Sequence, residues 1–267
     1  MKTWVLLRGL TREAGHWGGF VDELRAVMPA DDCFVTPDLQ GNGLRWREDS
    51  PTDVEAMVAA CRQDLQARGL KPPYTVLAMS LGAMVTAAWA SRHPAELHAC
   101  MLINTSLKPF SPFWQRLRPR QYPRILALLL TRPDALAWER AIMQMTTRHP
   151  LEPDATLAQW LALRQSHPVS TRNGLRQLIA AIRYRAPPAR PPVPMLLLNS
   201  LGDQLVHPAC SEALSRAWRV PLIRHPTAGH DLPLDAAPWV ARQVHDWLAQ
   251  LPELAPPHPP VTPLPAP

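Results

Sequence analysis

A single serine stands where a short strand passes directly into a helix, a position that can make its hydroxyl a nucleophile. Ser80 follows the apolar run Thr75 to Met79, and the small residues Ala78 and Gly82 stand two positions before and after it. Only small neighbours permit the strained turn that such a passage requires. The turn projects the hydroxyl beyond the sheet edge at a helix N-terminus, where the helix dipole favours developing negative charge. We therefore predict that Ser80 is a nucleophile.

A serine hydroxyl is a weak nucleophile near neutral pH, so a base and an acid that orients the base are also needed. Two later loops offer them: Asp203 follows the predicted strand Met195 to Asn199, and His230 follows the predicted strand Val220 to Arg224. Taken singly, an Ala-x-Ser-x-Gly stretch, a Gly-Asp pair and a Gly-His pair are ordinary turn sequences. Their common placement after predicted strands indicates a Ser-His-Asp triad.

Other acids near the predicted base fit less well. Asp231 and Asp235 adjoin His230 too closely in sequence to approach it from the loop of another strand. After the preceding strand, Asn104 and Thr105 offer no carboxylate. Asp203 is therefore the predicted acid.

The elements that would position these residues alternate along the chain. Six apolar runs of strand length are each followed by a turn and then a helical pattern, which is typical of a mostly parallel sheet with helices on both faces. The predicted strands are Trp4 to Leu7, Cys33 to Thr36, Tyr74 to Met79, Ala99 to Asn104, Met195 to Asn199 and Val220 to Arg224. The predicted covering helices are Trp17 to Met28, one that has Ser50 as its N-cap and closes at Gly69, Leu81 to Arg92, Pro208 to Trp218 and Ala237 to Leu248.

The alternation stops between Asn104 and Pro194, where helical segments are separated by prolines. We expect residues 105–193 to form a helical cap over one edge of the sheet, inserted between core parts at residues 1–104 and 194–251. A few helices that extend the core are the alternative. The last 17 residues hold 8 of the 32 prolines, so residues 252–267 are predicted to be a proline-rich disordered tail.

The stretch Ala78 to Gly82 resembles the nucleophile elbow of the α/β-hydrolase family, Gly-x-Ser-x-Gly, with alanine in place of the first glycine. The loops that carry Asp203 and His230 resemble the acid and histidine loops of that family and occur in the family's order. The resemblance implies a three-layer α/β-hydrolase fold of about six mostly parallel strands with a helical cap. Only three residues precede Trp4, so we expect no N-terminal antiparallel hairpin and the strand order two, one, three, four, five, six.

Acyl transfer also needs N–H donors aimed at the oxyanion of the tetrahedral intermediate. We expect the first of these donors to be the backbone of Leu81, directly after the nucleophile. The loop that begins Arg8-Gly9-Leu10 resembles the family's His-Gly-x turn, which implies that Gly9 makes the turn and that Leu10 is the second donor of this oxyanion hole. Arg8 stands where the family usually has histidine.

The resemblance implies hydrolysis of a small-molecule carboxylic ester or thioester through an acyl-enzyme, with no cofactor and no metal. A serine nucleophile argues against the epoxide hydrolases and haloalkane dehalogenases of this fold, which attack with an aspartate. Two alternatives to an esterase stay open: an acyl thioesterase, and a ligand-binding module without catalysis. Substrate-binding candidates are Gly9 and Met79 beside the nucleophile and Trp114, Trp138 and Met143 in the cap, together with Met145 and Trp160; packed cap core is the alternative for the cap residues.

Charge is unevenly distributed in a chain whose net charge is +6, since Lys108 to Arg190 holds 14 basic residues against 4 acidic ones. A basic cap can attract an anionic partner such as a coenzyme A ester or an acidic carrier protein. The layout resembles the pimeloyl-carrier methyl ester esterases of biotin synthesis. The alternative is a general preference for arginine, because the chain has 25 Arg and 3 Lys. Nucleic-acid binding has no reading motif to support it.

Composition excludes several classes of protein. With 46% hydrophobic and 19% charged residues, the chain is not disordered throughout. No apolar run approaches the ~20 residues of a membrane span, and the apolar start is too short for a signal peptide. The four cysteines form no C-x-x-C pair. We therefore expect a cytoplasmic protein with reduced core thiols and no membrane span.

Overall fold

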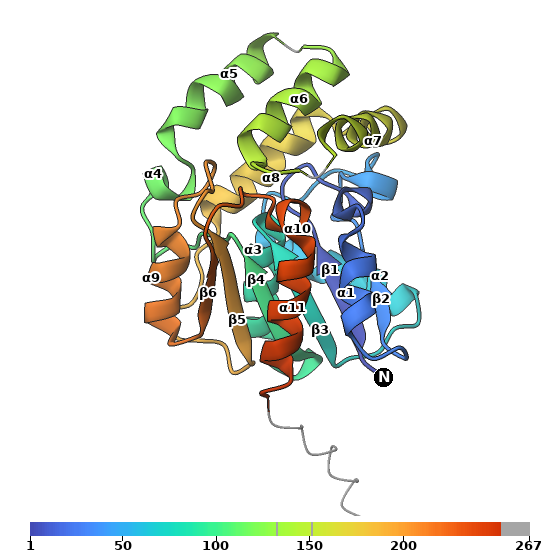
Figure 1. Ribbon diagram of the computed structural model, residues 1–267, viewed down its shortest axis with the longest axis vertical. Coiled ribbons are helices and arrows are strands. Elements are labelled where there is room, and N and C mark those ends of the chain that lie inside the picture. Colours follow the sequence, from blue (N-terminus) through green and yellow to red (C-terminus); the bar gives the residue numbers. More distant parts are fainter. Residues whose placement is uncertain (132, 151, 252–267) are drawn as a thin grey trace, which may run out of the picture.

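The protein is built on a six-stranded parallel sheet, described here by a computed structural model that covers residues 1–131, 133–150 and 152–251. The strands lie in the order β2-β1-β3-β4-β5-β6, and every pairing is parallel (Figure 1). Both the α/β class and the predicted strand order are confirmed. The predicted tail at 252–267 lies outside the described residues. The strands are β1 Thr3–Leu7, β2 Cys33–Val35, β3 Tyr74–Met79, β4 Leu97–Ile103, β5 Met195–Ser200 and β6 Leu222–His225.

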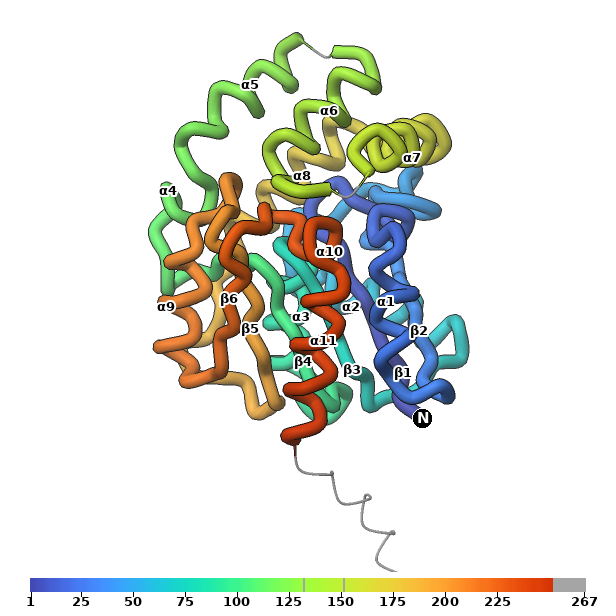
Figure 2. The backbone as a smooth tube through the Cα atoms, in the orientation of Figure 1, coloured from blue at the N-terminus to red at the C-terminus, as the bar shows by residue number. Residues whose placement is uncertain are grey.

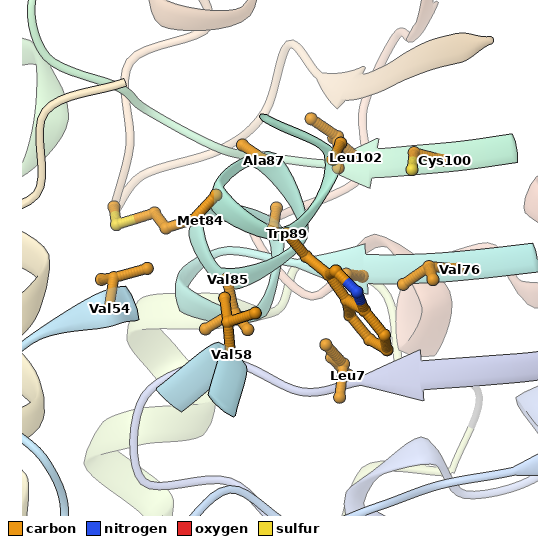
Figure 3. Packing of buried hydrophobic residues seen from close by; sticks show 14 of the residues in the cluster. Leu7, Val54, Val58, Val76, Met84, Val85, Ala87, Trp89, Cys100 and Leu102 are labelled. Atoms are coloured by element: carbon orange, nitrogen blue, oxygen red, sulfur yellow. The ribbon is translucent and has the colours of Figure 1, made fainter. Parts of the chain in front are cut away.

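One face of the sheet packs against α2 Val54–Ala67, α3 Leu81–Arg92 and α9 Ala209–Trp218. Val5 and Leu7 of β1 point to this side, because successive residues of a strand face opposite ways. Trp89 of α3 lies at the centre of the packing shown in Figure 3, between Val76 and Leu7. Burying an aromatic side chain of this size contributes about 3 kcal/mol, which holds α3 and the residue before it against the sheet.

The opposite face packs against α1 Phe20–Val27 and α11 Ala237–Leu248. Trp4 and Leu6, the residues that alternate with Val5 and Leu7 on β1, belong to this second core. Figure 2 shows α11 crossing in front of the sheet with α1 beside it. Strands buried on both faces read as unbroken apolar runs, which explains why they were visible in the sequence.

Some boundaries differ from the sequence-based ones. The helix predicted over Trp17 to Met28 is a 3-10 turn, Ala14–Trp17, followed by α1, because Gly18 breaks the chain at a positive φ of 52°. The N-cap of α2 is Asp53, whose carboxylate accepts from Ala56 N at 3.0 Å. The prediction that Ser50 is the N-cap is therefore wrong, and the Ser50 hydroxyl instead donates to Gln40 O.

Helices between β4 and β5 lie above the carboxyl edge of the sheet (Figures 1 and 2). They contact the core through polar bonds as well as packing: Arg118 donates to Asp203 O at 2.6 Å, and Gln121 Nε2 donates to Gln204 O at 2.9 Å. These helices therefore lie over the strand ends that carry the predicted triad. They are α4 Phe113–Arg116, α5 Tyr122–Thr131, α6 Ala135–Thr146, α7 Pro153–Ser166 and α8 Thr171–Arg183.

All four cysteines are free thiols, but Cys33 is exposed at the sheet edge, so the prediction that all four belong to the core is wrong for that residue. The other three, Cys61, Cys100 and Cys210, are buried. Within the described ranges, no helix combines the length and apolar character needed to cross a bilayer.

Candidate active site

Ser80 occupies a strained turn between β3 and α3. Its φ is 52° and its ψ is −115°, a conformation that side-chain-bearing residues rarely adopt. The turn is held by Ser80 N, which donates to Ile103 O of β4 at 3.0 Å. Gly82 is required there, because a Cβ atom would lie 2.5 Å from Leu7 O and 2.7 Å from Arg8 O. The first turn of α3 is thus pressed against the end of β1.

The loop after β1 lies directly against the serine. A Cβ atom on Gly9 would come within 3.1 Å of Ser80 Cβ, so a larger residue there would push the loop away. Leu10 and Leu81, the predicted oxyanion donors, therefore flank the serine from two backbone segments. Among the hydrogen bonds of the described residues, neither backbone N–H has an acceptor. Two N–H groups without an acceptor beside a serine hydroxyl are the arrangement that an oxyanion hole needs.

The acid and the base meet although they are far apart in the sequence. His230 Nδ1 lies 2.7 Å from Asp203 Oδ2, and both side chains are buried. The other carboxylate oxygen of Asp203 accepts from Leu205 N at 2.7 Å and Val206 N at 2.9 Å. A carboxylate fixed in this way orients the imidazole with Nδ1–H toward Asp203 and leaves Nε2 free to accept a proton.

Opposing effects set the proton affinity of His230. Burial lowers the pKa of the imidazole, but the charge of Asp203, its hydrogen bond and the charge of Asp231 together outweigh burial and raise the pKa above 6.5. Ser80 and His230 line the same cavity. No hydrogen bond joins Ser80 Oγ to the imidazole among those of the described residues. General-base catalysis requires these two side chains to come within hydrogen-bond reach of each other when substrate is bound.

Asn104 fastens the loop that carries the histidine, a role that the sequence analysis missed because it sought only carboxylates there. Its Nδ2 donates to His230 O at 2.8 Å, and its Oδ1 accepts from Ser200 N at 2.9 Å. Asn104 itself has a positive φ of 45°. An asparagine directly after a buried strand was the available signal, since this residue type tolerates that conformation and can bond in both directions.

Arg8 and Asp231 form a buried ion pair beside the histidine. Arg8 Nη1 donates to Asp231 Oδ1 at 3.1 Å and Nη2 to Oδ2 at 2.5 Å, and the two side chains are 4% and 3% exposed. The guanidinium also stacks on Trp17, 4.8 Å from the ring centre. Arg8 thus occupies the family's usual histidine position as one half of a salt bridge. Asp231 is engaged by Arg8 and makes no hydrogen bond to the imidazole among the described contacts.

A cavity of about 250 Å³ opens above the serine, between the strand ends and the overlying helices. Of the predicted substrate-binding residues, Gly9, Met79 and Trp138 line it, as does Met145. Trp114 does not, because it lies on the outside of α4, 52% exposed against Phe113. Met143 and Trp160 are buried in the packing of the helices and are not among the lining residues. Most of the wall is apolar, with Met84, Leu117, Ile125, Leu128, Leu129, Ile142, Val169, Leu175, Leu178 and Val206 contributing.

A second group of buried charges joins the loop after β1 to the overlying helices. Glu139 of α6 is 2% exposed and lies 2.7 Å from Arg12 Nη1 and 3.4 Å from Arg164 Nη1. The two guanidinium groups stack on Trp160 and Trp138, respectively. Burial lowers the pKa of Arg164 and Glu139 opposes that effect. These arginines therefore brace the cavity wall, and each has a carboxylate partner.

Comparison with known proteins agrees with this architecture. The model of the family described as "Alpha/beta hydrolase family" matches residues 4–243. A homoserine O-succinyltransferase of Xanthomonas campestris is 27% identical over 247 residues, which is 82% of this chain but 65% of that protein. A thermophilic esterase from Thermogutta terrifontis superposes with a TM-score of 0.72 at 18% identity, covering 94% of this chain and 90% of the other. An enol-lactonase from Burkholderia xenovorans LB400 gives the same TM-score and identity, covering 94% and 92%.

Proposed function

The chain belongs to the alpha/beta hydrolase family, and on that premise we propose that it is a serine hydrolase that cleaves carboxylic esters through an acyl-enzyme on Ser80. The observation that carries the proposal is the 2.7 Å contact between His230 and Asp203, made at the wall of the cavity that Ser80 also lines. A buried carboxylate with both oxygens satisfied and an imidazole with one nitrogen free constitute a general base.

The proposed reaction has two steps. His230 Nε2 takes the proton from Ser80 Oγ as the oxygen attacks the ester carbonyl, and the resulting oxyanion accepts from the N–H groups of Leu10 and Leu81. His230 then returns the proton to the departing alcohol, which leaves an acyl-enzyme. A water molecule, deprotonated by the same imidazole, attacks this second ester and releases the acid and the free serine.

The cavity indicates the kind of acyl group. Its wall is mostly apolar, and three of the four arginines that line it, Arg8, Arg12 and Arg164, are already paired with carboxylates. An uncharged hydrocarbon group gains most from such a wall, at about 0.8 kcal/mol for each buried CH₂. We therefore favour esters with an apolar acyl chain that fits a space of about 250 Å³.

An active-site probe tests the assignment. A fluorophosphonate reports an activated serine, so wild-type protein should be labelled and should hydrolyse short p-nitrophenyl esters, whereas Ser80→Ala should do neither. Ser166→Ala is the matched control, because Ser166 is an exposed serine at the end of α7. If Ser80→Ala keeps its turnover, Ser80 is not the nucleophile. If a folded wild-type protein is neither labelled nor active, the chain is a binding module without catalysis.

Transfer of the acyl group to an alcohol instead of water is a second candidate, favoured by the similarity to a homoserine O-succinyltransferase. The acyl-enzyme is common to both outcomes, and only the nucleophile of the second step differs. Because the chain spans 65% of the length of that relative, its acceptor is not carried over. Adding homoserine or a simple alcohol during ester turnover distinguishes the two: a transferase releases a new ester, whereas a hydrolase releases only the acid.

Several predictions made from the sequence belong to this proposal. An oxygen ester and a thioester differ at the leaving group, so parallel series of p-nitrophenyl esters and acyl thioesters of equal chain length would separate esterase from thioesterase.

Four further statements stay predictions: the cap role of residues 105–193, a cytoplasmic location, an acidic carrier partner and the likeness to pimeloyl-carrier esterases. Ordering of the overlying helices on substrate binding, measured by hydrogen exchange, would test the cap.

A further inference from the structure

Large apolar side chains are exposed on the two successive helices α4 and α5. Phe113 is 67% exposed, Trp114 52%, Leu126 55% and Leu130 73%, and Tyr122 is also exposed at 37%. Tyr122, Leu126 and Leu130 are spaced four residues apart, so they form one stripe along α5. We call these five residues the α4–α5 face. An exposed apolar cluster of this kind marks a contact surface.

The same segment is strongly basic. Between Lys108 and Thr131 the chain has five basic residues and no acidic one. Arg116 and Arg118 donate to backbone carbonyls, of Ala181 in α8 and Asp203 in the core. Arg120 and Arg124 are exposed. Arg120 contacts only the neutral Gln204 side chain among its described partners, and Arg124 is in none of the described ion pairs. The exposed half of this segment therefore combines rings and leucines with cations that have no carboxylate among their described contacts, and Arg124 lies at its margin, about 160° around α5 from Leu126.

The other side of α5 reaches the cavity. Ile125, Leu128 and Leu129 line the space above Ser80, whereas Leu126 and Leu130 point outward. In Figure 1, α4 and α5 lie at the outer margin of the helices above the sheet. Apolar surface thus continues around α5 from the cavity wall to the outside of the molecule. The candidate site and the outward-facing leucines therefore lie on different sides of one ten-residue helix, α5.

We propose that the α4–α5 face docks on an anionic lipid bilayer, with its aromatic and leucine side chains in the headgroup region and Arg120 and Arg124 against lipid phosphates. Exposed Trp, Phe and Leu beside arginines are the composition of surface-seeking helices. A second copy of the chain is disfavoured as the occupant because two such basic faces repel each other. An acidic carrier protein would need the cations but not five large exposed apolar groups.

Docking there would place the cavity next to the membrane, so the ester would be one whose acyl chain partitions into lipid. This statement about substrate rests on the proposed function, whereas the docking itself does not. Ser80→Ala should bind vesicles as the wild type does. Loss of activity without loss of vesicle binding would therefore contradict only the hydrolase assignment.

Vesicle sedimentation tests the docking. The full chain is mixed with vesicles of phosphatidylcholine containing about one third phosphatidylglycerol, and with pure phosphatidylcholine, at low and high salt. We expect binding to the anionic vesicles that weakens as salt rises, since each cation near the surface contributes about fivefold to the partition coefficient. Leu126→Glu with Leu130→Glu should reduce binding at least tenfold, and Arg120→Gln with Arg124→Gln should remove most of the salt dependence. Both double variants should hydrolyse a soluble short ester at the wild-type rate.

Leu44→Glu is the matched control, because Leu44 is 81% exposed on the loop after β2 and belongs to no part of the α4–α5 face. This variant should bind as the wild type does. Equal binding to both kinds of vesicle, no binding to either, or the same loss in Leu44→Glu would overturn the proposal. So would light scattering that shows a dimer in the wild type and a monomer in the leucine variant, because a second copy would then cover the face.

Discussion

Replacing Asp231 by asparagine separates stability from catalysis at the candidate site. Asp231 follows the proposed base directly, yet its carboxylate is paired with Arg8 by two hydrogen bonds, of 3.1 and 2.5 Å. Both side chains are almost fully buried, at 4% and 3% exposure. The substitution leaves the Arg8 guanidinium buried without a counter-charge, whereas the bond between His230 and Asp203 is untouched.

The expected loss of stability is large. Removing one partner of a buried ion pair lowers the free energy of unfolding by about 3–5 kcal/mol. For a chain of this size, each kcal/mol lowers Tm by about 2–4 °C, so Asp231→Asn should melt roughly 6–20 °C below the wild type. The double variant Arg8→Met, Asp231→Leu removes both charges and should recover most of the stability that the single variant loses. Scanning calorimetry of the three proteins measures this.

The expected effect of Asp231→Asn on the rate is small, but the pH profile of the rate should shift in a defined direction. Asp231 contributes to raising the pKa of His230, so its neutralisation should lower that pKa. The acidic limb of kcat/KM should therefore move to lower pH, with the plateau retained at a temperature where the variant is folded. Asp203→Asn should instead cost about 10⁴-fold in kcat, because the imidazole loses the group that sets its tautomer. A 10⁴-fold loss in folded Asp231→Asn, with Asp203→Asn nearly unaffected, would refute the assignment of the acid.

Three smaller changes probe other parts of the site. Gly82→Ala should lower kcat by at least tenfold with little change in ester KM, because its Cβ would displace the end of β1 at Leu7; normal kinetics would contradict the close packing beside Ser80. The pKa of His16 is lowered by burial and by neighbouring arginines, so the folded state resists its protonation and stability should fall as pH drops below about 6.5. His16→Gln should show a smaller loss of Tm between pH 7.5 and 5, and an equal loss would exclude His16 as its source. Trp138→Ala should shift the preference of ester turnover toward longer acyl chains, as a p-nitrophenyl ester series would reveal, since Trp138 lines the cavity.

Features that depend on local sequence were predictable. The four central strands, β1, β3, β4 and β5, are mostly buried and are nearly unbroken apolar runs. The edge strands β2 and β6 are partly exposed, yet all six strands could be placed within one or two residues. The turn at Ser80 was recognisable because a strained backbone accepts only small neighbours. Boundaries were less certain where two capping groups compete: Ser50 and Asp53 both suit a helix start, and only the bond from Ala56 N to Asp53 decides between them.

Long-range pairings that no local motif signals were not predictable, in contrast to the pairing of Asp203 with His230. Arg8 and Asp231 are 223 residues apart, and nothing in either segment specifies the other. Trp114 and Met143 were assigned to substrate binding by residue type alone, but helical spacing does not say which side of a cap helix faces the cavity. Asn104 was overlooked because only a carboxylate was sought at that place. Its role is to join two backbone groups, His230 O and Ser200 N.

The basic residues of the middle segment serve two different roles. Its net charge therefore does not measure how strongly the segment attracts an external anion. Arg164 is paired inside the cavity wall, and Arg116 and Arg118 donate to backbone carbonyls of α8 and of the core, so these charges contribute to architecture. Arg120 and Arg124 are exposed and remain for an external anion. A net count cannot distinguish the two groups, but salt can, because screening weakens exposed charges far more than buried ones. Raising ionic strength should therefore release the protein from anionic vesicles at concentrations that leave its Tm nearly unchanged.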